Sequence, residues 1–90
     1  MNHFRLYVTG QNPVSIKAIE KLNHILKFRL ADRYSLEVID ILDNPKMAEE
    51  DEILATPSVI KLSPLPRRKI IGSLDDEEKV LMALGLIGGE

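Results

Sequence analysis

Few side chains in this chain of 90 residues are suited to enzymatic chemistry, because it has no cysteine and only two histidines, His3 and His24. A hydrolase needs a nucleophile, a base and an orienting group that converge in space. His3 lies at the terminus, and His24 is expected on the solvated face of a helix. Without a thiolate there is no redox centre, zinc–thiolate site or disulfide framework. The sequence therefore predicts a protein that is not an enzyme.

Two acidic runs, residues 49–52 and 75–78, could suggest a metal site. Consecutive helical residues point about 100° apart, so neither run presents carboxylates that converge. We expect solvated helix faces and favourable first-turn charges instead. The stretch Thr9–Pro13 lacks the lysine and the glycine spacing of a phosphate-binding loop. The sequence thus predicts neither a metal nor a cofactor.

The one dense basic cluster is Arg67, Arg68 and Lys69, where a turn meets a strand. Three interpretations remain open: nucleic-acid binding, an edge strand guarded against aggregation by charge, and a docking surface for an acidic protein partner. No aromatic residue is interleaved with the cluster, and a net charge of -2 with a pI near 5.7 gives no general attraction to nucleic acid or anionic membranes. We therefore expect neither of these two partners.

Composition indicates one globular domain over residues 1–90, with 44% hydrophobic and 29% charged residues. A chain of this length buries only ~60% of its unfolded surface, so its stability should be marginal and oligomerisation would help. No apolar run approaches the ~20 residues that span a bilayer. A strand pattern begins directly after the first residues, in the place of a signal peptide, so we expect no signal peptide. We expect a cytoplasmic protein.

Periodicity predicts seven elements that must position these groups. Strands are expected at Phe4–Thr9, Tyr34–Leu42, Val59–Leu62 and Lys69–Ile71, and helices from Pro13 to about Leu30, from Pro45 to Leu54 and from Asp75 to Leu86. The first helix should bury Ile16, Ile19, Leu22, Leu26 and Leu30, and the last should turn Val80, Leu81 and Leu84 inward. The nearly continuous apolar run of the second strand predicts a strand covered on both faces.

The order of these elements predicts an α/β fold of the thioredoxin-like type, βαβαββα, without redox cysteines. The first two strands should be parallel, and the last two should form an antiparallel hairpin around residues 63–66. Thr56-Pro57 opens the third strand, where proline is tolerated and an X-Pro bond can be cis. Thioredoxin-like domains place a cis-proline in this context.

Five segments of the chain are informative when they are read together: Leu6–Gly10, Leu36–Leu42, Asn44-Pro45, Ala48–Pro57 and Arg68–Leu74. The most specific of them is the acidic helix that runs into Ile-Leu-Ala-Thr-Pro. In this order, and over nearly the whole chain, the segments resemble the KaiB family of circadian-clock proteins.

This resemblance implies a regulatory protein that binds the N-terminal ATPase ring of KaiC. Lys17, Lys61 and Arg68 match basic family positions, and with Arg67 and Lys69 they form the expected partner-binding set. The resemblance also implies a metamorphic chain, whose C-terminal half has an alternative resting fold. Family habit, together with the small core and an antiparallel edge, favours a homo-oligomer, a dimer or a tetramer. The residues expected to determine the fold are Thr56, Pro57, Pro64, Pro66 and Ala83, the last at a position where several clock members carry glycine.

The chain departs from the family pattern at three places. The usual triple proline reads Pro64-Leu65-Pro66. Ser35 and Glu37 replace alanine and lysine in the surface associated with KaiA, which argues against KaiA recognition. Glu52 replaces a common lysine. The expected function is thus a KaiC-binding regulator of a clock, timer or stress response. One alternative is a stand-alone stress or chaperone-like factor. The other is a thiol-transfer enzyme, and the lack of cysteine counts strongly against it.

Overall fold

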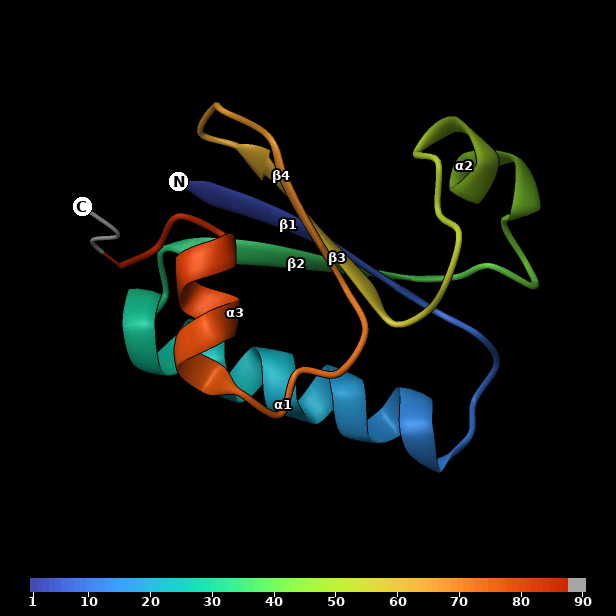
Figure 1. The fold of residues 1–90 in the computed structure, drawn as a ribbon, viewed down its shortest axis with the longest axis horizontal. Coiled ribbons are helices and arrows are strands. Elements are labelled where there is room, and N and C mark those ends of the chain that lie inside the picture. The colour runs from blue at the N-terminus through green and yellow to red at the C-terminus, as the bar shows by residue number, and fades with distance from the viewer. Residues whose placement is uncertain (88–90) are drawn as a thin grey trace.

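The computed structural model describes residues 1–87, and its element order confirms the predicted βαβαββα fold (Figure 1). The elements are β1 (Asn2–Val8), α1 (Pro13–Leu30), β2 (Tyr34–Asp40), α2 (Pro45–Glu50), β3 (Ser58–Ser63), β4 (Arg68–Ile71) and α3 (Glu77–Ala83).

The four strands form one sheet in the order β2-β1-β3-β4. β1 pairs parallel to β2 and antiparallel to β3, and β3 pairs antiparallel to β4. α1 and α3 lie on the same side of the sheet, whereas α2 lies apart from them (Figure 1). β1 is therefore central, and β2 and β4 are the two edges.

Two apolar clusters pack on the two faces of the sheet. The larger joins β1 and β3 to α1 and α3, with fully buried Leu6, Leu22, Val59 and Leu84. The smaller joins β1, β2 and β3 to α2 and consists of Tyr7, Ile39, Ala48 and Ile60. Alternation along β1 explains the division, because neighbouring residues such as Leu6 and Tyr7 point to opposite faces.

α1 begins as the sequence predicts, with Asn12 accepting a hydrogen bond from the Ser15 N–H and Pro13 in the first turn. The prediction of its buried face is wrong at Ile16, which is 50% exposed. Ile25 is fully buried, since the apolar stripe that meets the sheet is rotated toward Ala18, Leu22 and Ile25.

The predicted burial of β2 on both faces is also wrong. β2 is an edge strand, and Val38 is 42% exposed. Its β-branched run reflects a preference for extended backbone rather than full burial.

Both short helices are shorter than predicted. α2 ends at Glu50 because Glu52 adopts a left-handed backbone with φ of 55°. α3 begins two residues late, after the Asp76 cap, and ends at Ala83. There Gly85, at φ 71°, donates its N–H to the Met82 carbonyl and Leu86 donates to the Leu81 carbonyl, the Schellman pattern that closes a helix.

The Thr56-Pro57 peptide bond is cis, and so are Ser63-Pro64 and Leu65-Pro66. Within residues 1–87, no helix combines the length and apolar character needed to cross a membrane.

Candidate functional site

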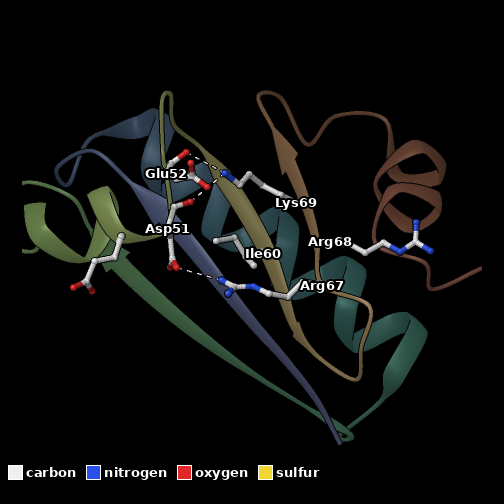
Figure 2. Close-up of a pocket in the computed structure, with 7 residues that line it drawn as sticks. Asp51, Glu52, Ile60, Arg67, Arg68 and Lys69 are labelled. Carbon is white, nitrogen blue, oxygen red and sulfur yellow. Dashed lines mark hydrogen bonds and ion pairs between the residues drawn. The ribbon is translucent and has the colours of Figure 1, made fainter.

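Strand alternation divides the predicted basic cluster between the two faces of the sheet (Figure 2). Arg67 and Lys69 point toward Asp51 and Glu52 beside α2, whereas Arg68 points the other way, toward α3. The three cations that are adjacent in sequence therefore do not form one patch.

Arg67 and Lys69 contact the end of α2. Nη2 of Arg67 lies 3.2 Å from Oδ1 of Asp51, and its side chain is still 53% exposed. Nζ of Lys69 donates to the carbonyl oxygens of Asp51 at 3.1 Å and Glu52 at 3.0 Å. α2 has no basic residue in its own last turn, so Lys69 supplies the cation that a helix C-terminus favours. Both side chains have a structural role, and Arg67 keeps free donors for a partner.

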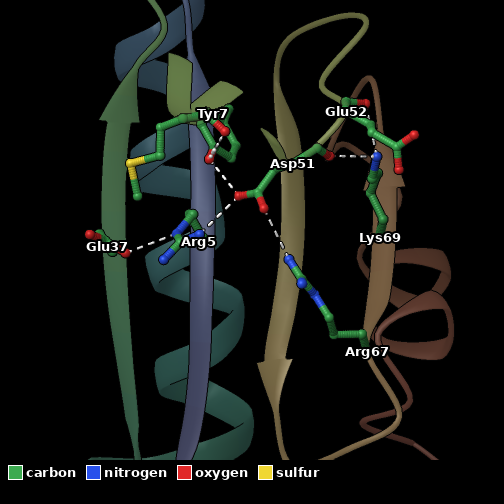
Figure 3. A network of polar contacts seen from close by, with 8 residues as sticks. Arg5, Tyr7, Glu37, Asp51, Glu52, Arg67 and Lys69 are labelled. Atoms are coloured by element: carbon green, nitrogen blue, oxygen red, sulfur yellow. Dashed lines mark hydrogen bonds and ion pairs between the residues drawn. The ribbon is translucent and has the colours of Figure 1, made fainter. Parts of the chain in front are cut away.

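Asp51 is the centre of this arrangement (Figure 3). Its Oδ2 accepts hydrogen bonds from the Tyr7 hydroxyl at 2.5 Å and from Nη1 of Arg5 at 2.9 Å. Nε of Arg5 also donates to Glu37 at 2.9 Å. With Arg67 on its other oxygen and only 11% of its side chain exposed, Asp51 joins α2 to β1 and to the β3–β4 hairpin.

These contacts shift three pKa values. Burial opposes the charge of Asp51, but the hydrogen bonds from its three donors outweigh burial and hold the pKa of Asp51 below its usual range. Burial, together with the hydrogen bond to Asp51, raises the pKa of Tyr7 to about 12. Burial also opposes the charge of Arg5, yet its two carboxylate partners raise its pKa. The group is thus a stabilised ion pair network rather than a poised acid or base.

The sequence interpretation missed this network. Asp51 was taken as part of a solvated acidic run, but it is largely buried. The detectable signal was Arg5 and Tyr7 at alternate positions of one strand, which places both on the same face. Only the fold reveals that α2 lies against that face.

Arg68 packs against the C-terminal end of α3, close enough that a Cβ added at Gly85 would lie 3.0 Å from its Nε. In the register of the sheet, Arg68 is the partner of Lys61. Lys61 is only 5% exposed, so in this fold its side chain is largely covered rather than displayed with Lys17 and Arg68. It projects from β3 on the side of the large core, where its aliphatic stem is covered.

Lys17 lies on the exposed side of α1, beside Pro57. The two residues line a groove of about 350 Å³ with Val14, Ala18, Lys21, Thr56 and residues 72–75. The Thr56 hydroxyl lies 2.6 Å from that of Thr9. Residues 72–75 follow β4, whereas Arg68 begins it, so Lys17 and Arg68 lie near opposite ends of a strand about 13 Å long.

The remaining residues expected to determine the fold lie in the C-terminal half. Pro64 and Pro66 are exposed in the β3–β4 turn, and Ala83 is the partly buried last residue of α3. Within residues 1–87, no three acidic or histidine side chains come together as a metal site.

The sequence matches the KaiB domain over residues 5–86. It is 52% identical to the circadian clock oscillator protein KaiB of Synechococcus elongatus over 86 residues, which cover 96% of this chain and 84% of that protein. It is 53% identical to the KaiB of Acaryochloris marina over 83 residues, 92% of this chain and 80% of that protein.

Solved structures support the fold. The N-terminal domain of Synechococcus elongatus SasA superimposes with a TM-score of 0.77 at 24% identity, covering 99% of this chain and 88% of that one. Mitochondrial thioredoxin 3 of Saccharomyces cerevisiae gives a TM-score of 0.73 at 14% identity, covering 96% and 78%. These two similarities concern the thioredoxin-like fold alone, and this chain has no cysteine.

Proposed function

The chain belongs to the KaiB family, and from this membership we propose that it is a non-enzymatic regulator that binds a KaiC-like ring ATPase in a circadian clock, timer or stress-response system. The single observation that carries the proposal is the family match over residues 5–86, combined with about half the sequence shared with curated clock proteins. Its relatives act in circadian oscillators, which gives this chain a clock regulatory role.

The charge of α1 supports docking to an acidic partner surface. Its 18 residues carry four cations, Lys17, Lys21, Lys27 and Arg29, and one anion, Glu20, although the whole chain has a net charge of -2. Such an asymmetry steers association with an oppositely charged surface and makes it salt-dependent. Lys17 and Arg68 remain in the proposed contact set, with Arg67 and Lys69 at its margin because both also contact α2.

Glu37 supports the expectation that KaiA is not a partner. It lies on the edge strand β2 and is held by Arg5 at 2.9 Å, so the negative charge is fixed at that edge. A KaiA surface that complements the lysine of other family members would meet a glutamate, with the opposite charge, at this position. A homo-oligomer of the free protein, a dimer or a tetramer, also remains part of the proposal, because the small core, the antiparallel edge and family habit favour it.

The proposal is tested by binding the ATPase ring encoded in the same genome, immobilised with ATP, over a range of salt concentrations. We expect Lys17→Glu to weaken binding at least fivefold and to flatten its salt dependence, with a similar effect of Arg68→Gln. Lys46→Glu is the matched control, because it makes the same charge change on exposed α2, across the sheet from α1. If Lys17→Glu leaves binding unchanged at low salt, this surface is ruled out. If the unmodified protein does not bind the ATPase ring, the alternative of a stand-alone stress factor is favoured.

A further inference from the structure

A second surface, unrelated to Lys17 and Arg68, lies on the α2 side of the molecule. It is an apolar groove of about 490 Å³ lined by Ile41, Pro45, Ala48, Glu49, Glu52, Ile53 and Leu54. Leu54 is 90% exposed, an unusual position for a large apolar side chain in a chain with so small a core. The volume falls in the range of ligand and peptide pockets.

The rim of this groove is acidic. Glu49 and Glu52 are exposed, and within residues 1–87 neither carboxylate forms an ion pair or a hydrogen bond. Asp51, between them, is already neutralised by its cationic partners. The two free carboxylates therefore set the charge that a ligand of the groove would meet.

The backbone fixes the position of Glu52. Its φ of 55° is uncommon for a residue other than glycine, asparagine or aspartate. Its N–H donates to the Glu49 carbonyl at 3.0 Å, and its own carbonyl accepts from Lys69 at 3.0 Å. These two contacts fix the backbone of Glu52, so its Cα–Cβ bond leaves the chain in a set direction at the rim of the groove.

We propose that this groove binds a cationic amphipathic segment of a second protein, with apolar side chains against Ile53 and Leu54 and lysine or arginine at Glu49 and Glu52. Charge complementarity selects this occupant, since an acidic rim around an apolar floor repels anionic lipid surfaces and acidic segments. Helices with one apolar and one basic face dock in grooves of this kind.

The groove lies across the sheet from α1, so the segment does not compete with the proposed ATPase partner for Lys17. α2 packs in the small cluster with Tyr7 and Ile60, whereas α1 packs in the large one. The proposal consequently does not depend on KaiC binding, and either can fail alone.

The first experiment uses a synthetic amphipathic helix of leucine and lysine as the probe, and the same helix with glutamate in place of lysine as its counterpart. NMR spectra of the isotope-labelled protein are recorded during titration. We expect saturable binding of the lysine peptide, with chemical-shift changes centred on residues 41–54, and no binding of the glutamate peptide. Shift changes centred on the acidic start of α3, or no saturation, overturn the proposal.

Variants then distinguish binding of the peptide in the groove from nonspecific electrostatic attraction of a cationic peptide to an acidic protein. Glu49→Gln with Glu52→Gln should weaken peptide binding about tenfold and reduce its salt dependence, and Leu54→Ser should weaken it similarly with no change in salt dependence. The matched control is Glu77→Gln with Glu78→Gln, which removes the same charge from α3. Equal weakening by the control pair contradicts the proposal.

Sedimentation of the free protein tests the competing occupant, a second copy that uses its basic α1. Self-association that Leu54→Ser abolishes, and that the lysine peptide displaces, assigns the groove to a second copy and overturns the proposal. A sedimentation profile that Leu54→Ser leaves unchanged supports it. Because Leu54 is almost fully exposed, its substitution should leave the fold intact.

Discussion

The Tyr7 hydroxyl, on the central strand, donates a 2.5 Å hydrogen bond to the carboxylate of Asp51, the residue that follows the last turn of α2. Tyr7 is fully buried in the small apolar cluster, so this bond joins the core of the α2 side to the polar network above it. The same oxygen of Asp51 accepts from Arg5. The position of α2, and with it the acidic groove, therefore depends on a few polar contacts more than on a large buried area.

Replacing Tyr7 by phenylalanine should lower the free energy of unfolding by about 1.5 kcal/mol, because a buried charged acceptor loses one donor while the ring still packs. Urea unfolding at neutral pH measures the effect. Tyr34→Phe is the matched control, since the Tyr34 hydroxyl makes only exposed bonds of 3.2 and 3.4 Å to Asn23 and should cost less than about 0.5 kcal/mol. Equal losses for the two variants would show that the bond to Asp51 contributes nothing special.

Asp51 should make stability depend on acid pH. Its pKa is lowered in the folded protein, so its contribution is present above the unfolded value of about 3.9 and is lost as pH falls through the lower folded value. We expect Asp51→Asn to cost about 2–3 kcal/mol at pH 7 and progressively less below about pH 4. Urea unfolding of both proteins from neutral to strongly acidic pH measures this difference. A cost that stays constant over the whole range contradicts the assignment.

Tyr7 should make stability depend on alkaline pH. Its folded pKa is raised to about 12, so its contribution is complete below the unfolded value of about 10 and is lost as pH rises toward the folded value. The chain has two tyrosines and no tryptophan, so Tyr34→Phe leaves Tyr7 as the sole strong ultraviolet chromophore. Absorbance titration of that variant should give a midpoint near 12. A midpoint near that of free tyrosine would contradict the burial and bonding described for Tyr7.

Gly85→Ala should destabilise α3 by about 1–2 kcal/mol, because an added Cβ meets both the left-handed backbone and Arg68 at 3.0 Å. Gly72→Ala is the control for strain alone, since Gly72 also has a positive φ but no atom within 4 Å of an added Cβ. Thermal unfolding of both variants, with and without Arg68→Ala, separates the two causes. If Arg68→Ala does not reduce the cost of Gly85→Ala, the contact between the two residues is not what limits this position.

The sequence predicted the elements well where one physical signal dominated. Asn12-Pro13 marks the start of α1, and Thr56-Pro57 lies just before β3, in the context where thioredoxin-like domains place a cis-proline. Local patterns failed where the outcome depended on neighbours in the sheet. Val38 looked buried because β-branched residues are common in all strands, and nothing local reveals that β2 lies at an edge.

The candidate site was harder to predict because its contacts join distant parts of the chain. Arg67 and Lys69 looked free as a basic run, yet both reach α2, 16 to 18 residues earlier in the sequence. Lys61 joins the predicted docking set because it matches a family lysine, whereas its register opposite Phe4 places it over the core. The positions of the charged residues can be read from the sequence, but the pairing of the strands determines which of them form contacts within the molecule.

Ala83→Gly tests the proposed metamorphic behaviour of the C-terminal half. Ala83 is the last residue of the seven-residue α3, and glycine in a helix costs roughly 1 kcal/mol relative to alanine. Where two folds of one sequence differ by only a few kcal/mol, a bias of this size shifts their populations about fivefold. We expect the variant to lose helical chemical shifts over residues 77–83, gain an extended population over residues 73–86, and capture the KaiC-like ATPase more slowly or weakly. NMR spectra of the two proteins measure the populations, with Ala55→Gly, in the exposed loop before β3, as the control. Indistinguishable spectra for Ala83→Gly and the unmodified chain would leave Ala83 without a role in choosing the fold.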